Sequence, residues 1–404
     1  MTKSFARVAS GRTFANSKRH IGETCKFYVS VSHPIKYRQV FIVDFSFFAV
    51  ICPSARGLRR VLLVAGLCLL AACAPQAQVW HQEGYVFGTR VDVSIYDDGG
   101  HTREAATAAF DDVLREFDRL HRAWHAWLPS ELSRLNEALA AGRTAQVSGE
   151  LAALLQEAQR LSALGDGLFD PGIGRLIALW GFQADEFAPR LPDREAVQTF
   201  LRTRPGIRQL HIEQDAVRSE NPAVQLDLGG YAKGYALDRA AEILRQHGFH
   251  NALINIGGNL LALGSKGGTP WRIGIQHPRE GAPLATLPLY DGEAVGTSGD
   301  YQRYFELDGR RYSHLIDPRS GAPAQGTQSL TVLVTPRPQA GVISDAASKA
   351  PFIAGARHWR DYTRRYGIEH ALRVDADGSI QITRALRART QLPARIQAQV
   401  QVVE

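Results

Sequence analysis

The stretch Asp227-Leu228-Gly229-Gly230-Tyr231-Ala232-Lys233-Gly234-Tyr235-Ala236 joins two predicted elements through a pair of glycines. It follows the apolar run Val224–Leu226, which predicts a strand, and it opens Tyr231–His247, whose alanines and leucines recur at helical spacing. Lys233 falls in the first turn of that helix. Free N–H groups at a helix start, the helix dipole and a lysine together form an anion site suited to a pyrophosphate. A plain glycine turn with a solvated lysine is the alternative that this stretch alone leaves open.

The segments on either side of this stretch predict the fold class. Before it, a strand pattern at Tyr85–Ile95 is followed mainly by helical patterns, at Arg103–Trp124, Leu151–Leu164 and Arg194–Thr203, with short strands at Leu210–Ile212 and Val217–Ser219. After it come short strand patterns at Ala252–Ile256, Leu260–Leu263, Trp271–Ile275, Leu284–Leu289, Tyr304–Leu307 and Leu330–Val334. The chain closes with helical patterns at Val342–Ala350 and Trp359–Tyr366 and a hairpin of Ala371–Val374 and Ser379–Thr383. This order predicts an α+β, two-lobed domain with mixed or antiparallel sheets and packed helices, not a doubly wound sheet.

Two loops between the later strands carry hydroxyls, carboxylates and a histidine. They are Val295–Tyr301 and Arg311–Gly321. Loops between strands often hold catalytic groups. His314 is therefore a candidate proton acceptor, although a lone histidine is more often structural. We expect three side chains to lie near it and tune its pKa: Ser298, Asp300 and Asp317.

The segment Ser344–Ala350 places Asp345 and Lys349 four residues apart on one predicted helical face. An ion pair on the surface is the simplest interpretation. A carboxylate facing a cleft is also a ligand type for a divalent cation, which binds through oxygen.

The charge of the chain is concentrated at its beginning. The whole sequence of 404 residues has a formal net charge of +7, but residues 1–73 hold eleven Lys and Arg against two acidic residues. The remainder carries 36 basic and 38 acidic residues, a net of −2, so an electrostatic attraction to nucleic acid has no support. All four cysteines, Cys25, Cys52, Cys68 and Cys73, also lie in this first part, which leaves the rest without disulfides or cysteine metal sites.

Arginines and a short apolar run before Cys73 predict export. Arg56, Arg59 and Arg60 precede Val61–Ala72, which is too short to span a bilayer and ends in small residues. The ending Leu70-Ala71-Ala72-Cys73 resembles a bacterial lipobox, which implies cleavage before Cys73 and lipidation of that cysteine.

A signal peptide begins near its arginines, so we expect translation to start close to Arg56 and residues 1–55 to be a non-structural leader. The expected organisation is a leader at 1–55, a signal peptide at 56–72, a tether at 73–84, the domain at 85–385 and a C-terminal tail at 386–404.

Taken in order, the motifs resemble the ApbE family, the FAD:protein FMN transferases. The resemblance runs from Phe87 to Gly355, most of the predicted domain. The motifs that carry it are Phe87-Gly88-Thr89, the stretch Ser130-Glu131-Leu132-Ser133-Arg134-Leu135-Asn136, Phe169-Asp170-Pro171, the stretch from Asp227 to Ala236, Thr297-Ser298-Gly299-Asp300-Tyr301, Tyr312-Ser313-His314-Leu315-Ile316-Asp317-Pro318 and Asp345-Ala346-Ala347-Ser348-Lys349-Ala350.

The resemblance implies that FAD binds between two lobes, with a divalent metal, usually Mg²⁺, at its pyrophosphate. By position, the residues implied to contact FAD are Phe87, Trp127, Leu168, Phe169, Asp170, Asp227, Lys233 and Leu315. The implied metal ligands are the Gly230 main-chain carbonyl and the Asp345 carboxylate.

Three departures from the family pattern bear on this site. Phe87 replaces the usual Met, and a segment one residue short leaves the aromatic contact open between Trp124 and Trp127. Lys349 stands where the family has a metal-binding Thr, and a protonated lysine has no lone pair for a metal. We therefore expect Lys349 to pair with Asp345 and to weaken any dependence on Mg²⁺.

The activity implied is transfer of the FMN moiety of FAD to a Thr or Ser hydroxyl of a partner protein, with release of AMP. His314 is the first candidate for accepting the hydroxyl proton and Asp300 the second. The implied partners are exported subunits of membrane redox complexes, and the expected location is the periplasmic side of a bacterial membrane, inner or outer, through a lipid anchor. Two alternatives stay open: an FAD pyrophosphate hydrolase and a periplasmic flavin-binding protein without catalysis.

Overall fold

The computed structural model describes residues 77–184 and 186–404. The predicted leader, signal peptide and lipidated Cys73 lie outside these residues. No helix in the described ranges is both long enough and apolar enough to cross a membrane.

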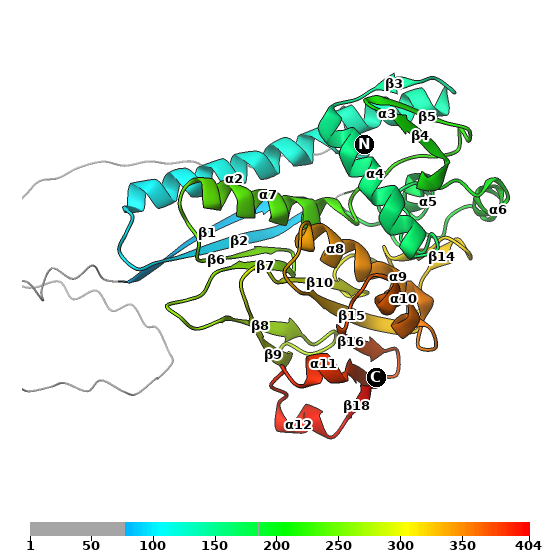
Figure 1. Ribbon diagram of the computed structural model, residues 1–404. Coiled ribbons are helices and arrows are strands. Elements are labelled where there is room, and N and C mark those ends of the chain that lie inside the picture. Colours follow the sequence, from blue (N-terminus) through cyan, green and yellow to red (C-terminus); the bar gives the residue numbers. More distant parts are fainter. Residues whose placement is uncertain (1–76, 185) are drawn as a thin grey trace, which may run out of the picture. The chain divides into compact units, whose positions relative to one another are not determined.

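One nine-stranded sheet forms the centre of the domain (Figure 1). Neighbouring strands are antiparallel except for the last pair, β17 and β18, which is parallel. In spatial order the strands are β1 (Gln78–Val86), β2 (Thr89–Asp97), β6 (Ala252–Ile256), β7 (Asn259–Leu263), β10 (Ala294–Gly299), β15 (Thr327–Val334), β16 (His370–Asp375), β17 (Ile380–Thr383) and β18 (Val400–Val403).

Two long helices cover one face of this sheet (Figure 1). They are α2 (Arg103–Ala123) and α7 (Ala232–Gln246), and α8 (Ala340–Ala347) packs beside α7. In β2 only alternate residues, such as Val91 and Val93, are buried against them, as the two-residue period of a strand requires.

The other face is covered at its later strands by a second core. The hairpin of β8 (Trp271–Gln276) and β9 (Pro283–Leu289) packs there, together with α11 (Arg384–Arg387) and α12 (Ala394–Gln397). Every residue of β15 is buried, since helices cover one of its faces and this second core covers the other.

A third apolar cluster forms the second lobe. It joins α5 (Gly174–Leu179) and α6 (Arg194–Thr203) to the hairpin of β11 (Tyr304–Leu307) and β12 (Arg310–Ser313). The rings of Trp180, Phe305 and Tyr312 stack, with centroids 5.2 Å apart for Phe305 and Tyr312. The α+β, two-lobed fold is therefore confirmed.

The remaining elements are helices and a 3₁₀ turn that pack in the core beside α2 and α7, and short strands that form two small separate sheets. They are α3 (Glu131–Ala140), α4 (Gly149–Leu164), α9 (Lys349–Ala354), α10 (Trp359–Arg365), the 3₁₀ turn η1 (Ile207–Gln209), β3 (Ala145–Gln146), β4 (Leu210–Glu213), β5 (Ala216–Ser219), β13 (Ile316–Asp317) and β14 (Ala322–Pro323).

Two predicted boundaries are corrected by the structure. The tether predicted at 73–84 is too long, because β1 begins at Gln78; its two faces are mostly exposed, so the strand shows no apolar alternation. The tail predicted at 386–404 belongs to the domain. Leu386 and Ile396 are buried in the second core, and β18 extends the sheet.

Two predicted strands are also corrected. Tyr85–Ile95 is not one strand but parts of β1 and β2, which turn at Phe87 and Gly88. Val224–Leu226 forms no strand beyond one bridge, from Gln225 to Ile173. The Asn136 side chain satisfies the Leu226 backbone instead, accepting from its N–H at 2.7 Å and donating to its carbonyl at 2.9 Å.

Candidate functional site

A cavity of about 940 Å³ lies between the helices on the sheet and the second lobe. This volume falls within the usual range for ligand sites. Most of the predicted site residues line it: Phe87, Trp127, Leu168, Phe169, Asp170, Asp227, Gly230, Lys233, His314, Leu315 and Lys349. Asp345 and Asp300 do not.

The tip of the β1–β2 hairpin forms one wall of the cavity. Phe87 has a φ of 57°, a left-handed conformation that is unfavourable for a bulky residue. Its ring is held by Phe117, at 6.2 Å between centroids, and by His121, at 5.8 Å. The turn thus places an aromatic ring in the wall of the cavity.

Two tryptophans lie in the same wall, so the structure brings both candidates for the aromatic contact to the cavity. Trp124 is 5% exposed and packs edge-on against Tyr235. Trp127 is 38% exposed and contacts the His125 ring at 4.4 Å. The more exposed Trp127 is the better placed of the two to stack on a flat ligand ring.

The start of α7 forms the anion-binding end of the cavity. Within the described residues, no protein group accepts from the backbone N–H groups of Gly230 and Lys233. The Lys233 side chain lines the cavity at the same place. Desolvation lowers the pKa of Lys233, and Lys349 and Arg303 lower it further, while Asp345 acts in the opposite direction. An anion bound here would relieve that crowding of positive charge.

The carboxylate of Asp227 fixes the turn before α7. Asp227 accepts from the Gly229 N–H at 2.9 Å and from the Gln183 side chain, also at 2.9 Å. Its backbone N–H donates to the Pro171 carbonyl. Asp227 therefore ties the glycine turn to the segment that carries Phe169 and Asp170.

Asp170 fixes the backbone on one side of the cavity. Its Oδ1 accepts from the backbone N–H groups of Gly172, at 2.7 Å, and Ile207, at 2.8 Å. Burial nevertheless raises the pKa of Asp170 to about 6. These contacts position Leu168 and Phe169, both buried, along the cavity wall.

His314 is held in one tautomer by the Arg303 carbonyl. The distance from His314 Nδ1 to this oxygen is 3.1 Å. Because a carbonyl oxygen can only accept, Nδ1 carries the hydrogen, and in the neutral ring Nε2 has the free lone pair. The backbone N–H of His314 donates to the same oxygen at 3.0 Å. The imidazole is thus oriented and chemically able to accept a proton at Nε2.

The charged groups that act on His314 differ from those predicted. Its pKa is lowered to about 3, mainly by desolvation and also by Arg303, Lys233 and Lys349. The predicted neighbours are engaged elsewhere, because Ser298 bonds to Ser348, Asp317 to Arg319 and Asp300 to Arg279. The expectation that these three residues tune the pKa of His314 is therefore wrong.

Asp300, the second candidate for proton acceptor, is held by two bonds to Arg279, at 2.7 and 2.6 Å, and does not line the cavity. Its motif precedes the loop of His314 in the sequence, but the Asp300 side chain binds Arg279 instead.

Lys349 pairs with Asp345, as predicted. The Lys349 Nζ lies 2.6 Å from Asp345 Oδ1 and 2.7 Å from the Asp345 carbonyl oxygen. Asp345 is 1% exposed, so the pair is not the surface ion pair of the simplest interpretation. Burial alone would raise the pKa of Asp345, but Lys349, Lys233 and the hydrogen bonds hold it below its usual value.

The residues present do not fit a divalent metal. Asp345 Oδ1 is bound to Lys349, and Oδ2 accepts from the Gly234 N–H at 2.9 Å. The Lys349 Cε would lie 2.9 Å from a Cβ added to Gly230, so the lysine packs directly on the glycine whose carbonyl is the other implied ligand. The Lys349 side chain therefore already packs against one implied metal ligand, and its ammonium group binds the other.

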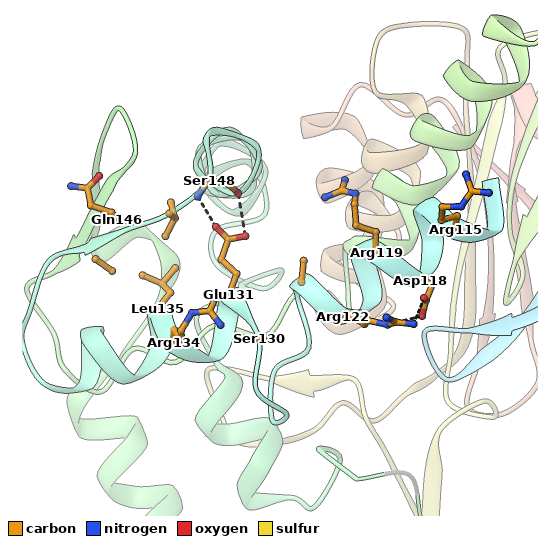
Figure 2. Close-up of a pocket in the computed structure, with 13 residues that line it drawn as sticks. Arg115, Asp118, Arg119, Arg122, Ser130, Glu131, Arg134, Leu135, Gln146 and Ser148 are labelled. Atoms are coloured by element: carbon orange, nitrogen blue, oxygen red, sulfur yellow. Dashed lines mark hydrogen bonds and ion pairs between the residues drawn. The ribbon is translucent and has the colours of Figure 1, made fainter. Parts of the chain in front are cut away.

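A second hollow, of about 810 Å³, lies beside α2 and α3 (Figure 2). Three of its arginines are neutralised by carboxylates: Arg115 by Asp112, Arg119 by Glu116 and Glu150, and Arg122 by Asp118. It therefore offers an anion less charge than the start of α7 does.

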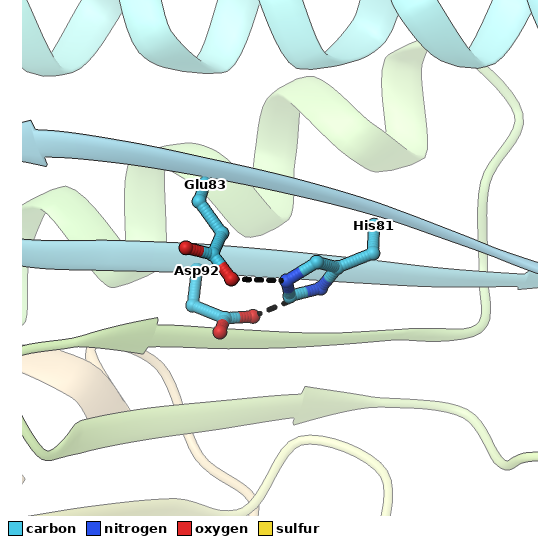
Figure 3. Close-up of side chains that lie close together, drawn as sticks. All are labelled: His81, Glu83 and Asp92. Atoms are coloured by element: carbon cyan, nitrogen blue, oxygen red, sulfur yellow. Dashed lines mark hydrogen bonds and ion pairs between the residues drawn. The ribbon is translucent and has the colours of Figure 1, made fainter. Parts of the chain in front are cut away.

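A group of metal-ligand types lies on the β1–β2 hairpin (Figure 3). His81 is 3.0 Å from Glu83 and 3.2 Å from Asp92. Arg90 contacts both carboxylates, at 2.6 and 3.3 Å, and none of these residues lines the large cavity. Ion pairing within the hairpin accounts for this group.

Sequence reasoning missed Arg303, which lines the cavity and donates to the Phe182 carbonyl at 2.9 Å. It also missed His121 and His125, whose rings lie 5.1 Å apart in the wall beside Phe87. The signals were present, since Arg303 closely follows the TSGDY motif and the histidines flank Trp124.

Comparisons with known proteins match this architecture. The sequence pattern of the ApbE family matches residues 87–372. The FAD:protein FMN transferase of Rhodobacter capsulatus is 40% identical over 329 residues, which cover 81% of this chain and 61% of that protein. The FAD:protein FMN transferase of Vibrio cholerae is 34% identical over 277 residues, or 68% of this chain and 82% of that protein.

Two crystal structures are similar over the same region. The ApbE protein of Thermotoga maritima superposes with a TM-score of 0.70 at 31% identity, covering 78% of this chain and all of that one. The apo flavinyl transferase ApbE of Pseudomonas stutzeri superposes with a TM-score of 0.67, also at 31% identity, covering 78% and 97%.

Proposed function

This chain belongs to the ApbE family, and from that premise we propose that it transfers FMN from FAD to a hydroxyl side chain of another protein. The observation that carries the proposal is that His314, with Nε2 available, and the cationic start of α7 line one cavity. A phosphorus atom bound at α7 would thus lie in a cavity that also holds a proton acceptor.

In the reaction, the hydroxyl oxygen of an acceptor Thr or Ser attacks the phosphorus of the FMN half. The bond from that phosphorus to the bridging oxygen breaks, and AMP leaves with the electron pair. His314 Nε2 takes the hydroxyl proton. Such transfers depend mainly on positioning and on neutralising the negative charge of the transition state.

The protein's own groups supply that neutralisation. Lys233 and the N–H groups of Gly230 and Lys233 would bind the pyrophosphate, where the helix dipole adds to their effect. Arg303 and Lys349 line the same cavity and both act electrostatically on Lys233 and His314.

The flat isoalloxazine ring requires an aromatic wall. Phe87 and Trp127 would provide it, and Leu168, Phe169 and Leu315 would contribute apolar contacts. Asp170 and Asp227 would act mainly by holding the turns that shape the cavity.

We propose export and lipidation for the part of the chain outside the described residues. The arginines before Val61–Ala72 and the ending at Cys73 support a lipoprotein on the periplasmic side of a bacterial membrane. Exported acceptors, such as subunits of membrane redox complexes, would then be in the same compartment.

The test is a flavinylation assay with FAD and a purified candidate acceptor protein. We expect a fluorescent, covalently flavinylated acceptor and one AMP for each FMN transferred, and no product when the acceptor Thr is replaced by Ala. AMP release without an acceptor would identify an FAD hydrolase. FAD binding without AMP under any condition would identify a flavin-binding protein without catalysis.

A further inference from the structure

The site that the family resemblance assigns to a metal is built differently in this chain. Lys349 reaches between Gly230 and Asp345, with its Nζ 2.6 Å from the Asp345 carboxylate and its Cε against the Gly230 backbone. The lysine side chain is only 12% exposed, so the surrounding protein holds it in this position.

The hydrogen-bonding capacity of Lys349 leaves one donor for a ligand. An ammonium group has three N–H donors and no acceptor. Two contacts of Nζ are within the protein, to Asp345 Oδ1 and to the Asp345 carbonyl. Because Lys349 also lines the cavity, its third N–H is available to a phosphate oxygen there.

Asp345 has little capacity left for a metal. One of its oxygens accepts from Lys349 and the other from the Gly234 N–H. A divalent cation would have to displace the ammonium group, since two cations do not share one carboxylate closely without a large electrostatic cost.

Several cations act at the end of the cavity where the pyrophosphate would bind. In addition to desolvation, Arg303, Lys233 and Lys349 all lower the pKa of His314, and Lys349 and Arg303 also lower that of Lys233. An anionic pyrophosphate at the start of α7 would be attracted to this end of the cavity.

We propose that the Lys349 ammonium replaces the divalent cation, so that this protein binds FAD and transfers flavin without a metal. The inference rests on the proposed function. It assigns Lys349 direct contact with the pyrophosphate, and it assigns Asp345 the role of positioning that lysine.

The test compares wild type with Lys349→Thr and Lys349→Met, each stripped of metal and assayed in EDTA and in excess Mg²⁺. We expect wild type to be equally active in both. Lys349→Thr should lose at least about tenfold in EDTA, the loss expected for one charge-assisted contact, and regain activity with Mg²⁺. Lys349→Met should be impaired in both, because methionine offers neither charge nor a ligand that Mg²⁺ favours.

Mn²⁺ binding, followed by electron paramagnetic resonance, gives a readout that does not depend on transfer. Wild type should bind no Mn²⁺ in the presence of FAD, and Lys349→Thr should bind it. Lys266→Thr is the matched control, since Lys266 is exposed and does not line the cavity. If no acceptor is ever flavinylated, the proposed function fails, but FAD affinity and Mn²⁺ binding still decide the role of Lys349.

Two results would overturn the inference. One is a wild type that is inactive in EDTA and regains activity with Mg²⁺, which would mean that Mg²⁺ displaces the Lys349 ammonium group. The other is a Lys349→Thr protein that remains fully active in EDTA, which would mean that its charge is not needed.

Discussion

At the scale of single residues, His314 depends on one backbone carbonyl. The backbone carbonyl of Arg303 accepts a hydrogen bond from His314 Nδ1, which leaves His314 Nε2 as the basic nitrogen. The lowered pKa, about 3, keeps the ring neutral in the protein without ligand. A pyrophosphate bound near Lys233 would offset the cations that lower this pKa, so substrate binding should make His314 a stronger base.

Replacing His314 by Asn tests this role while keeping an N–H donor for the Arg303 carbonyl. We expect flavin transfer to fall by roughly 10²–10⁴-fold, the usual contribution of a positioned base, with little change in FAD affinity. A histidine that is only structural would instead lower thermal stability and leave the turnover of the folded protein unchanged.

The direction of the pKa shift also predicts a pH dependence. A lowered pKa favours the neutral ring, so the contribution of His314 to stability is complete above its ordinary value of 6.5 and is lost as the pH falls towards 3. Without ligand, the free energy of unfolding of wild type should therefore fall more steeply below about pH 6 than that of His314→Asn. Parallel curves from urea titrations across this range would contradict the shift.

Lys233 is expected to act on FAD through its pyrophosphate. Lys233→Ala should weaken FAD binding by about 1.5–3 kcal/mol, the value of a hydrogen bond to a charged group, and should affect FMN less because FMN has a single phosphate. Calorimetry with both flavins measures the difference, and Lys266→Ala is the surface control. Equal FAD affinity of Lys233→Ala and wild type would exclude Lys233 from the site.

At the scale of elements, the crossing of α7 and α8 sets the position of Asp345. A Cβ on Gly234 would lie 2.4 Å from the Gly341 carbonyl and 2.8 Å from the Asp345 Cβ. The helices are in backbone contact there, and Asp238 strengthens the crossing by accepting from the N–H groups of Gly341 and Val342, both at 2.9 Å.

Gly234→Ala should therefore separate the two helices. We expect a loss of about 1–3 kcal/mol in the free energy of unfolding, as for an overpacked core, together with weaker FAD binding because Asp345 and Lys349 move. Gly281→Ala is the control, because no atom lies within 4 Å of its added Cβ. If the two variants unfold at the same denaturant concentration, the close crossing is not required.

Elements with a regular apolar stripe are the ones that the sequence predicts well. The pattern at Arg103–Trp124 corresponds to α2 and that at Tyr231–His247 to α7, each within one residue at either end. The pattern at Val342–Ala350 predicts one helix where the structure has two, α8 and α9, interrupted at Ser348. Pro351 accounts for the break, because it has no N–H for the carbonyl of Ala347, four residues earlier, and its ring crowds that carbonyl.

The candidate site was predictable to the extent that its residues lie in local motifs. Lys233 and His314 each stand in such a motif, and the i, i+4 spacing predicted the pair of Asp345 and Lys349. The orientation of His314 was not predictable, because it depends on a carbonyl across a hairpin, eleven residues away. The orientation of Asp300 towards Arg279 likewise depends on how the later strands pack.

At the scale of the whole molecule, the cavity and the predicted anchor occupy separate parts of the sequence. Every residue that lines the cavity lies between Tyr85 and Ile353. The predicted lipidation site, Cys73, precedes them all. Attachment to a membrane and flavin transfer should therefore be separable by substitution.

Cys73→Ala is expected to leave the protein in the soluble fraction after cell lysis, with flavin transfer to a soluble acceptor unchanged. A lipidated amino-terminal cysteine carries several acyl chains, and two or more are enough for stable anchoring, so loss of this one thiol should remove the membrane association completely. Fractionation with immunoblotting measures the location, and mass spectrometry identifies the mature amino terminus. Cys68→Ala is the matched control, because Cys68 lies within the predicted signal peptide and should be removed with it. A Cys73→Ala protein that still sediments with membranes, or a mature wild type that retains Met1, would show that the segment around Cys73 does not direct lipidation.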